Sequence, residues 1–217
     1  MSETQTQSST RSGLAGESGR VRLISAAAAE FSEHGFAGAS ISAIAARAGM
    51  SKSTVFHHFE TKQSLYMAVI GEAASEFGQK MDNVLSLDRD VNGCIKAFQI
   101  QHLEHLQRHA EVARLILREL QDNDSELAVS LVRDVLARNF NRLVEYLDRA
   151  SAAGLIRKDF DSHATALALF SANVMYFQNR AMLKHLPGFD LADDPKAYAE
   201  AVTKLIINGL GLKESNP

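Results

Sequence analysis

Hydroxyl and ammonium side chains gather in one short stretch of this chain, around two candidate helix starts. Ser40 and Ser51 each stand where a helix N-cap belongs, directly before a run of residues with helical spacing. Lys52, Ser53 and Thr54 open the second run. A lysine can donate to guanine O6 and N7, and a threonine offers a hydroxyl group or a methyl group for thymine. These residue types at the start of a helix predict contacts to base edges in a DNA major groove.

Two short helices joined by a tight turn would position these side chains. Apolar residues from Ile41 to Ala48 recur at helical spacing after the first cap. Gly49 follows, and a glycine can adopt the positive φ that ends a helix and turns the chain. The second helix spans residues 52–59. The pattern predicts a helix-turn-helix whose second helix reads DNA, held by a core of Phe36, Ile44, Val55 and Phe59.

Phosphate contacts should come from residues at the edges of this helix-turn-helix. The Ser40 hydroxyl and the backbone amides beside it can meet a phosphate at a helix N-terminus. A cap without any DNA contact is the alternative for Ser40, and both roles can hold together. His57 could reach either a base edge or a phosphate, and the sequence leaves this choice open.

Several short motifs follow one another here at fixed spacing. They are Gly35-Phe36, Ser40, Ile44-Ala45, Ala48-Gly49-Met50-Ser51, Phe56-His57-His58-Phe59 and Lys62-Gln63-Ser64-Leu65. In this order they resemble the DNA-binding domain of the TetR family of bacterial transcriptional regulators, over residues 20–65. The resemblance implies phosphate contacts for His58 and Lys62; a packed or solvated surface histidine is the alternative for His58. Phe56 stands where the family usually has a tyrosine, and therefore lacks the phenol that would bind a phosphate. The residues expected at the DNA interface are Ser40, Ser51, Lys52, Ser53, Thr54, Phe56, His57, His58 and Lys62.

Composition predicts an all-α protein. The chain has 3 prolines, no tryptophan and 7% aromatic residues, and alanine, leucine and arginine are abundant. No run of about 18 apolar residues could span a membrane, and the N-terminus has no signal-peptide core. Cys94 is the single cysteine, which fits a reducing cytoplasm. The formal net charge is −3, but bases outnumber acids between Ser18 and Ser64, where DNA would bind.

The resemblance and the helical periodicity together predict the domain organisation. We expect a disordered N-terminal arm at 1–17, a helix-turn-helix DNA-binding domain at 18–64 with three helices, and a larger helical effector-binding and dimerisation domain at 65–217. A first helix should span 18–34. Beyond the helix-turn-helix, a helix capped by Thr61 is followed by helices at 91–109, 111–121, 125–153, 162–185 and 195–209.

The helix at 162–185 is the expected dimer interface, by analogy with the family's four-helix interface. Small residues at Ala164, Ala168 and Ser171 would permit close approach of two backbones, and Leu167 and Val174 would supply buried area. An internal core helix of a monomer is the alternative.

The resemblance also implies an effector pocket among the central helices. Its candidate lining is Met67, Phe77, Met81, Phe98, His102, Leu106, Leu115, Arg118, Tyr146, Phe170, Asn173 and Phe177. Such a pocket would be mostly apolar and would suit a hydrophobic or amphipathic small molecule. Plain core packing is the alternative for each apolar residue, and a surface ion pair is the alternative for Arg118.

Three histidines fall on one face of the helix at 91–109. His102, His105 and His109 could ligate a metal ion, but Glu104 lies off that face and no cysteine pair supports the site. The spacing matches no zinc-protease motif. We therefore expect a stripe of core or solvated histidines, with no metal and no cofactor, and leave metal sensing as the alternative.

The predicted function is that of a cytoplasmic, ligand-responsive transcriptional regulator. A homodimer would bind a palindromic double-stranded DNA operator, most often as a repressor, and a small-molecule effector would release it. A metal-responsive repressor and an architectural DNA-binding protein without effector are the alternatives. No phosphate loop, nucleotide-binding glycine pattern or nucleophile elbow indicates an enzyme.

Overall fold

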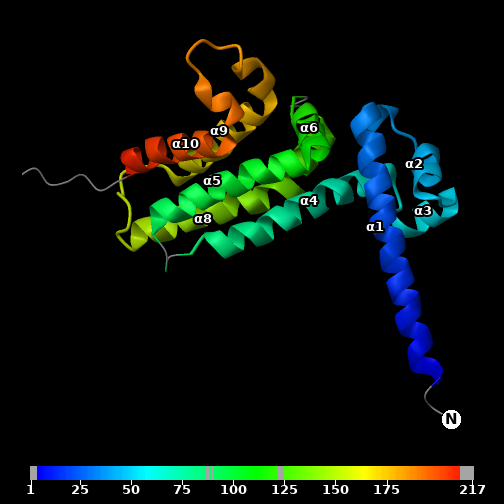
Figure 1. The fold of residues 1–217 in the computed structure, drawn as a ribbon. Helices are drawn as coiled ribbons and strands as arrows, with labels where there is room; N and C mark the ends of the chain where they lie inside the picture. Colours follow the sequence, from blue (N-terminus) through cyan, green and yellow to red (C-terminus); the bar gives the residue numbers. More distant parts are fainter. Residues whose placement is uncertain (1–3, 87, 89, 122–124, 211–217) are drawn as a thin grey trace, which may run out of the picture. The chain divides into compact units, whose positions relative to one another are not determined.

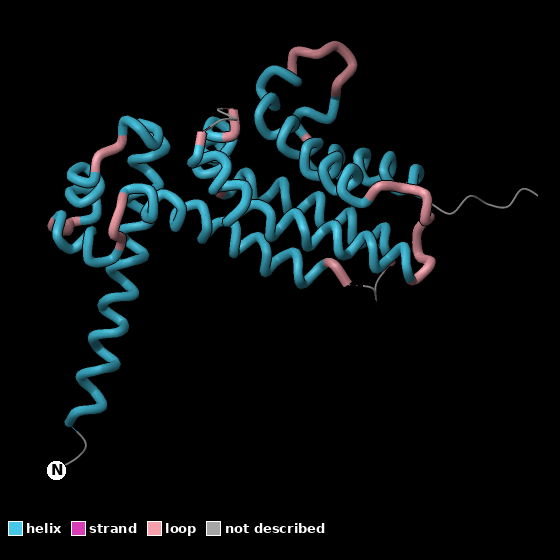
Figure 2. The backbone as a smooth tube through the Cα atoms, turned by 180° about the vertical axis from the view of Figure 1, so that it is seen from behind, coloured by secondary structure: helices cyan, strands magenta, loops and turns pink. Residues whose placement is uncertain are grey.

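The protein is built from helices joined by short loops (Figure 2). The computed structural model describes residues 4–86, 88, 90–121 and 125–210, and contains no strand within them. The α-helices are α1 (Thr4–Gly38), α2 (Ile41–Ala48), α3 (Lys52–His58), α4 (Lys62–Val84), α5 (Val91–Arg108), α6 (Ala110–Glu119), α7 (Glu126–Leu131), α8 (Ala137–Ala152), α9 (Ser162–Leu183) and α10 (Pro195–Leu210) (Figure 1). A π-helical segment, η1 (Val132–Leu136), and a 3-10 turn, η2 (Asp190–Asp193), complete the described chain. The predicted all-α fold is confirmed. No helix in these ranges combines the length and the hydropathy needed to cross a membrane.

These helices form two compact units. The first unit comprises Met1–Ala73 and Glu111–Asp124, and the second comprises Ala74–Ala110 and Ser125–Pro217. The division differs from the predicted boundary between residues 64 and 65 for two reasons. Helix α4 continues without a break past that point, and most of α6 belongs with the N-terminal helices.

A small aromatic cluster forms part of the core of the first unit. The Phe31 ring meets Tyr66 edge-on at 5.0 Å between centroids, and Phe36 meets Tyr66 at 5.1 Å. Ile44 of α2 and Val55 of α3 are fully buried. Each of the two short helices is therefore anchored by a side chain in a common core, which compensates for their weak intrinsic stability.

Helix α1 differs from the prediction at its start and agrees with it at its end. The structure begins α1 at Thr4, whereas the sequence predicted a disordered arm over 1–17. The first proline of the chain is Pro187, so no proline interrupts a helix in this region. Gly35 has a φ of 72° and breaks the helical backbone inside α1, which agrees with the predicted helix end at His34.

The second unit has a larger core between α4, α5, α8 and α9. Its fully buried side chains include Phe98 of α5, Tyr146 and Leu147 of α8, and Leu169 of α9. Helix α5 also packs against α10. The single helix predicted at 125–153 is divided into α7, η1 and α8. A π-helical segment has a wider turn than an α-helix, so it rotates the buried face of α8 relative to that of α7.

Candidate DNA-binding interface and effector site

Serine hydroxyls cap both helices of the helix-turn-helix, α2 and α3. The Ser40 Oγ accepts a hydrogen bond from the Ala43 amide at 3.1 Å, at the start of α2. The Ser51 Oγ accepts from the Thr54 amide at 3.1 Å, at the start of α3. Both predicted caps are confirmed. Each satisfies a backbone donor that the helix itself cannot pair.

The turn between α2 and α3 depends on Gly49. This residue lies in the left-handed region, with φ 67° and ψ 39°. Its amide donates to the Ala46 carbonyl at 3.1 Å, and the Met50 amide donates to the Ala45 carbonyl at 2.9 Å. These two bonds form the Schellman arrangement that closes a helix and reverses the chain. The predicted structural role of Gly49 is confirmed.

Helix α3 buries one side chain and presents several others to solvent. Val55 is 0% exposed, whereas the side chain of Phe56 on the next position is 49% exposed. Lys52, Ser53 and His57 are also exposed. The anchored helix therefore offers a mixed polar and apolar surface.

The hydroxyl groups at the start of α3 form a small network. The Ser51 Oγ lies 2.8 Å from both the Ser53 Oγ and the Thr54 Oγ1. Hydroxyl hydrogens rotate freely, so each group can exchange a bond within the network for a bond to an outside acceptor or donor. The Ser53 and Thr54 side chains are therefore positioned before any ligand arrives.

Lys62 has structural partners that the sequence did not predict. Its ammonium donates to the Ala39 carbonyl at 3.1 Å and to the Ala37 carbonyl at 3.4 Å, and lies 4.7 Å from the Phe36 ring centroid. Lys62 thus ties the start of α4 to the chain that enters α2. An ammonium has three donors, so one remains for a phosphate oxygen.

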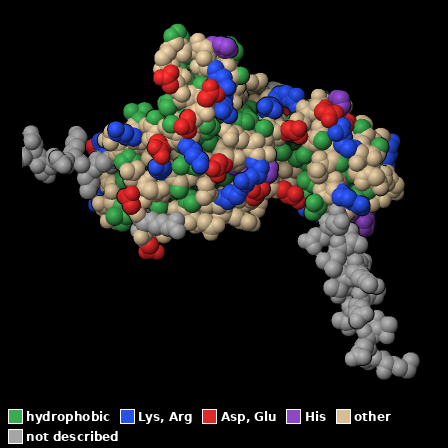
Figure 3. Space-filling model, viewed as in Figure 1, with side chains coloured by type: hydrophobic (Ala, Val, Ile, Leu, Met, Phe, Trp, Pro, Cys, Tyr) green, Lys and Arg blue, Asp and Glu red, His purple; other side chains and the backbone are tan. Residues whose placement is uncertain are grey.

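Acidic partners neutralise two of the bases expected to attract DNA. The Arg47 guanidinium forms two hydrogen bonds with Glu33, at 3.0 and 2.8 Å, and lies 3.6 Å from Glu30. The bond from Arg47 lowers the pKa of the Glu33 carboxyl. Arg20 pairs with Glu72. Positive and negative side chains are accordingly interspersed on the surface shown in Figure 3, and the local basic excess is smaller than the residue count indicates.

The structure separates the predicted effector residues into two groups. Met67, Leu115 and Arg118 belong to the first unit. The second unit contains Phe77, Met81, Phe98, His102, Leu106, Tyr146, Phe170, Asn173 and Phe177. A single pocket lined by all twelve stays a prediction, because the two groups belong to separate units.

Part of the second group forms an aromatic cluster around His102. The His102 ring centroid lies 5.1 Å from Phe77, 5.8 Å from Phe98 and 4.9 Å from Phe170. Burial lowers the pKa of His102 to about 3, with a smaller contribution from His105. His102 is therefore a neutral imidazole at physiological pH.

Polar groups join this aromatic cluster across α5 and α9. The Asn173 amide nitrogen lies 3.2 Å from the His102 Nδ1 and donates to the Gln99 carbonyl at 3.1 Å. The Gln99 side-chain amide donates to the Leu169 carbonyl at 3.1 Å. The buried Gln99 Oε1 and Asn173 Oδ1 have no hydrogen-bond partner within the described protein. Sequence reasoning missed Gln99, although a polar residue one turn before His102 on a core-facing position was a usable signal.

Comparison with known proteins explains the two-part architecture. Residues 23–69 match the profile of bacterial regulatory proteins of the tetR family, and residues 94–206 match the profile described as tetracyclin repressor-like, C-terminal domain. The chain belongs to the TetR family. The TetR-family assignment confirms the resemblance seen in the helix-turn-helix and extends it to the second unit.

TetR-family relatives and solved structures cover most of the chain. The probable acrEF/envCD operon repressor of Escherichia coli is 22% identical over 192 residues, which are 87% of this chain and 86% of the relative. The fatty acid degradation regulator FadR from Bacillus halodurans is 25% identical, with a TM-score of 0.73, and covers 87% of this chain and 98% of its own. Bacillus subtilis FadR in complex with stearoyl-CoA has a TM-score of 0.74 at 19% identity, over 88% of this chain and 98% of its own. The complex of SmeT, a repressor of Stenotrophomonas maltophilia, with triclosan has a TM-score of 0.71 at 19% identity, and the match covers 90% of this chain and 93% of SmeT.

Arg118 of this TetR-family chain has a backbone partner within the first unit. Its Nη2 donates to the Phe31 carbonyl at 3.3 Å, near the end of the regular part of α1. A side chain added at Gly35 would place its Cβ 3.4 Å from the Arg118 guanidinium. A cation at the C-terminal end of a helix satisfies a free carbonyl and interacts favourably with the helix dipole. Arg118 therefore has a structural role beside its predicted role in effector binding.

Proposed function

We propose that this TetR-family protein is a homodimeric repressor that binds a palindromic operator and is released by a small, largely apolar effector. The observation that carries the proposal is the pair of capped helices α2 and α3, in which buried Val55 anchors α3 while Lys52, Ser53 and His57 face solvent. A helix of this kind can enter a major groove without reorganisation. We place the protein in the cytoplasm and assign it no catalytic activity.

An apolar stripe on α9 supports the dimer. Leu167, Met175 and Met182 are 59%, 60% and 68% exposed, and their spacing places them on one helix face. Exposed Ala164, Ala168 and Ser171 lie on the same stripe. Leu205 on α10 is 73% exposed. Contiguous exposed apolar surface of this kind is typical of a protein interface, and small residues beside it permit close helix packing. A two-fold dimer would present two copies of α3 to half-sites about one helical turn, ~34 Å, apart.

The cluster around His102 supports an effector site in the second unit. Its aromatic rings favour an apolar ligand. The unpaired Gln99 Oε1 and Asn173 Oδ1 are acceptors, so an N–H or O–H group on the ligand would remove the cost of leaving them buried and unsatisfied. Two solved structures of this fold hold molecules with an apolar part, FadR with stearoyl-CoA and SmeT with triclosan, and this supports the proposed class of effector.

Helix α4 supports communication between effector and DNA. It is continuous from Lys62 to Val84 and contributes residues to both units. A ligand that changes the position of α4 in the second unit would therefore also move its N-terminal part, which carries Lys62. A coupling free energy of about 1–3 kcal/mol suffices to change operator occupancy several-fold or more.

The proposal can be tested by site selection with the full chain on random DNA. We expect enrichment of a palindrome, and binding to it as a dimer that weakens several-fold or more when a matching apolar compound is added. Selection of a non-palindromic site, or binding by a monomer, would contradict the proposal. An architectural DNA-binding protein would instead bind selected and random DNA equally and would ignore every compound.

A further inference from the structure

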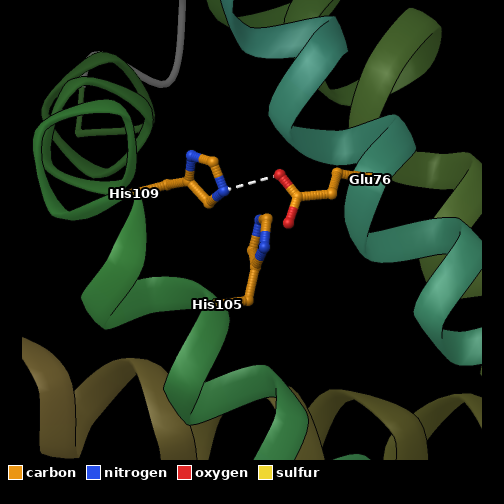
Figure 4. A group of neighbouring side chains, drawn as sticks. All are labelled: Glu76, His105 and His109. Carbon is orange, nitrogen blue, oxygen red and sulfur yellow. Dashed lines mark hydrogen bonds and ion pairs between the residues drawn. The ribbon is translucent and has the colours of Figure 1, made fainter.

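Three metal-ligating side chains meet at the C-terminal end of α5, within the second unit. Glu76 comes from α4, His105 lies in the last turn of α5, and His109 is the residue that caps α5 (Figure 4). One ligand atom from each residue lies within 4.8 Å of the other two. The His109 Nε2 is 2.8 Å from the Glu76 Oε2. His102, which shares a helix face with these histidines, interacts instead with Asn173.

His105 is held in place but has an unused nitrogen. It is 8% exposed, and its Nδ1 has no hydrogen-bond partner in the described protein. Its ring stacks on Phe77 at 5.0 Å and lies 4.5 Å from the His109 ring. Burial, followed by the nearby His109, lowers the pKa of His105 to about 4. Its imidazole is therefore neutral at pH 7, which is the form that coordinates a metal ion.

We propose that Glu76, His105 and His109 form a binding site for a divalent transition-metal ion such as Zn²⁺. Two imidazoles and one carboxylate suit zinc, cobalt and nickel better than calcium or magnesium. Ligand atoms around a tetrahedral zinc ion are about 3.3 Å apart. Closure would therefore move the His109 Nε2 and the Glu76 Oε2 apart by about 0.5 Å, and would bring any more distant pair together by at most about 1.5 Å. The side chain of His109 is 26% exposed and that of Glu76 is 40% exposed, which leaves a path for the ion and room for a water ligand.

Two neighbouring cations repel a metal ion at this site but also hold the Glu76 carboxylate in position. The Lys80 ammonium lies 2.6 Å and the Arg108 guanidinium 3.1 Å from the Glu76 Oε1. Their charge repels a metal ion, so we expect weaker binding than at a structural zinc site. Both cations engage Oε1, however, and so leave Oε2 directed toward His109. Outer hydrogen bonds of this kind orient a ligating carboxylate.

The site can be tested with metal alone on the untagged, chelator-treated full chain. We expect titration calorimetry to show one Zn²⁺ per chain, and Co²⁺ to give the visible absorption of a tetrahedral site. Glu76→Gln and His109→Gln should each weaken binding by about tenfold to a hundredfold or more. Glu104→Gln, on an exposed position of α5, and His185→Gln, at an exposed position after α9, are matched controls that should bind as the original does.

A measurement on the unmodified protein guards against variants that fail to fold. X-ray absorption at the zinc edge should show two imidazoles together with oxygen ligands. The absence of stoichiometric Zn²⁺ and Co²⁺ binding would show that the cluster is an ion-pair network only, and would overturn the proposal. Binding that survives both Glu76→Gln and His109→Gln, or an absorption spectrum without imidazole, would overturn it equally. None of these outcomes depends on the operator or the organic effector.

Discussion

At the scale of single residues, we expect Lys52 to distinguish one base from another in the operator. It opens α3 and is exposed, directly after the cap at Ser51. Lys52→Ala should reduce the free energy that separates the preferred operator from altered sequences by about 1–3 kcal/mol. Fluorescence anisotropy on an operator and on its single-base variants would measure this difference. If Lys52→Ala left the base preference in site selection unchanged, Lys52 would make no base-specific contact.

Lys62 should behave differently, because it has structural partners as well as its proposed phosphate contact. Lys62→Ala should weaken binding to operator and random DNA alike and reduce the slope of log affinity against log salt by about one. It should also lower the free energy of unfolding by about 1 kcal/mol, since the Ala39 carbonyl loses its donor. Salt titrations and chemical denaturation would measure the two effects. A loss confined to the operator would contradict the phosphate role.

At the scale of elements, the buried contact between His102 of α5 and Asn173 of α9 should make the free energy of unfolding depend on pH. The pKa of His102 falls from an ordinary 6.5 to about 3 on folding, so below pH 6.5 the unfolded chain binds a proton that the folded chain does not. The free energy of unfolding should therefore decrease as the pH falls from about 6.5 toward 3. His102→Asn should flatten this dependence by roughly 1–3 kcal/mol across the range.

Denaturation at several pH values with a chelator present would test this dependence. His163→Gln, at an exposed position on α9, is the matched control and should retain the original profile. A His102→Asn profile as steep as the original would show that other groups set the acid sensitivity.

The helices were predictable because their signals are local. Ser40, Ser51 and Gly49 mark starts and ends within a few residues of the features they control, and the structure places them as predicted. Pairings between distant segments left no comparable pattern. Glu76 lies near His105 and His109, about thirty residues further along the chain, and Arg118 donates to a carbonyl 87 residues away. Such contacts depend on how helices pack, which helical periodicity alone does not determine.

At the scale of the whole molecule, the stripe on α9 should control the oligomeric state. Leu167→Glu combined with Met175→Glu would place carboxylates on both exposed apolar positions, where a dimer would bury them without partners. The double variant should be monomeric in solution and should bind a palindrome at least about tenfold more weakly. Light scattering coupled to size-exclusion chromatography, followed by operator titration, would measure both.

Val129 provides the control for that experiment. It lies on α7 and is 54% exposed, outside the α9 stripe. Val129→Glu should leave both the molecular mass and the operator affinity unchanged. A double variant that remains dimeric would show that another surface joins the two chains.

The first unit is assembled from two separate pieces of chain, and this limits how regulators of this kind can be recombined. A chimaera that joins residues 1–73 to the remainder of a relative would keep Phe31 and Gly35 but exchange the α6 that carries Arg118. The end of α1 would then meet a foreign side chain. A transferable DNA-reading module therefore includes α6 as well as the N-terminal helices.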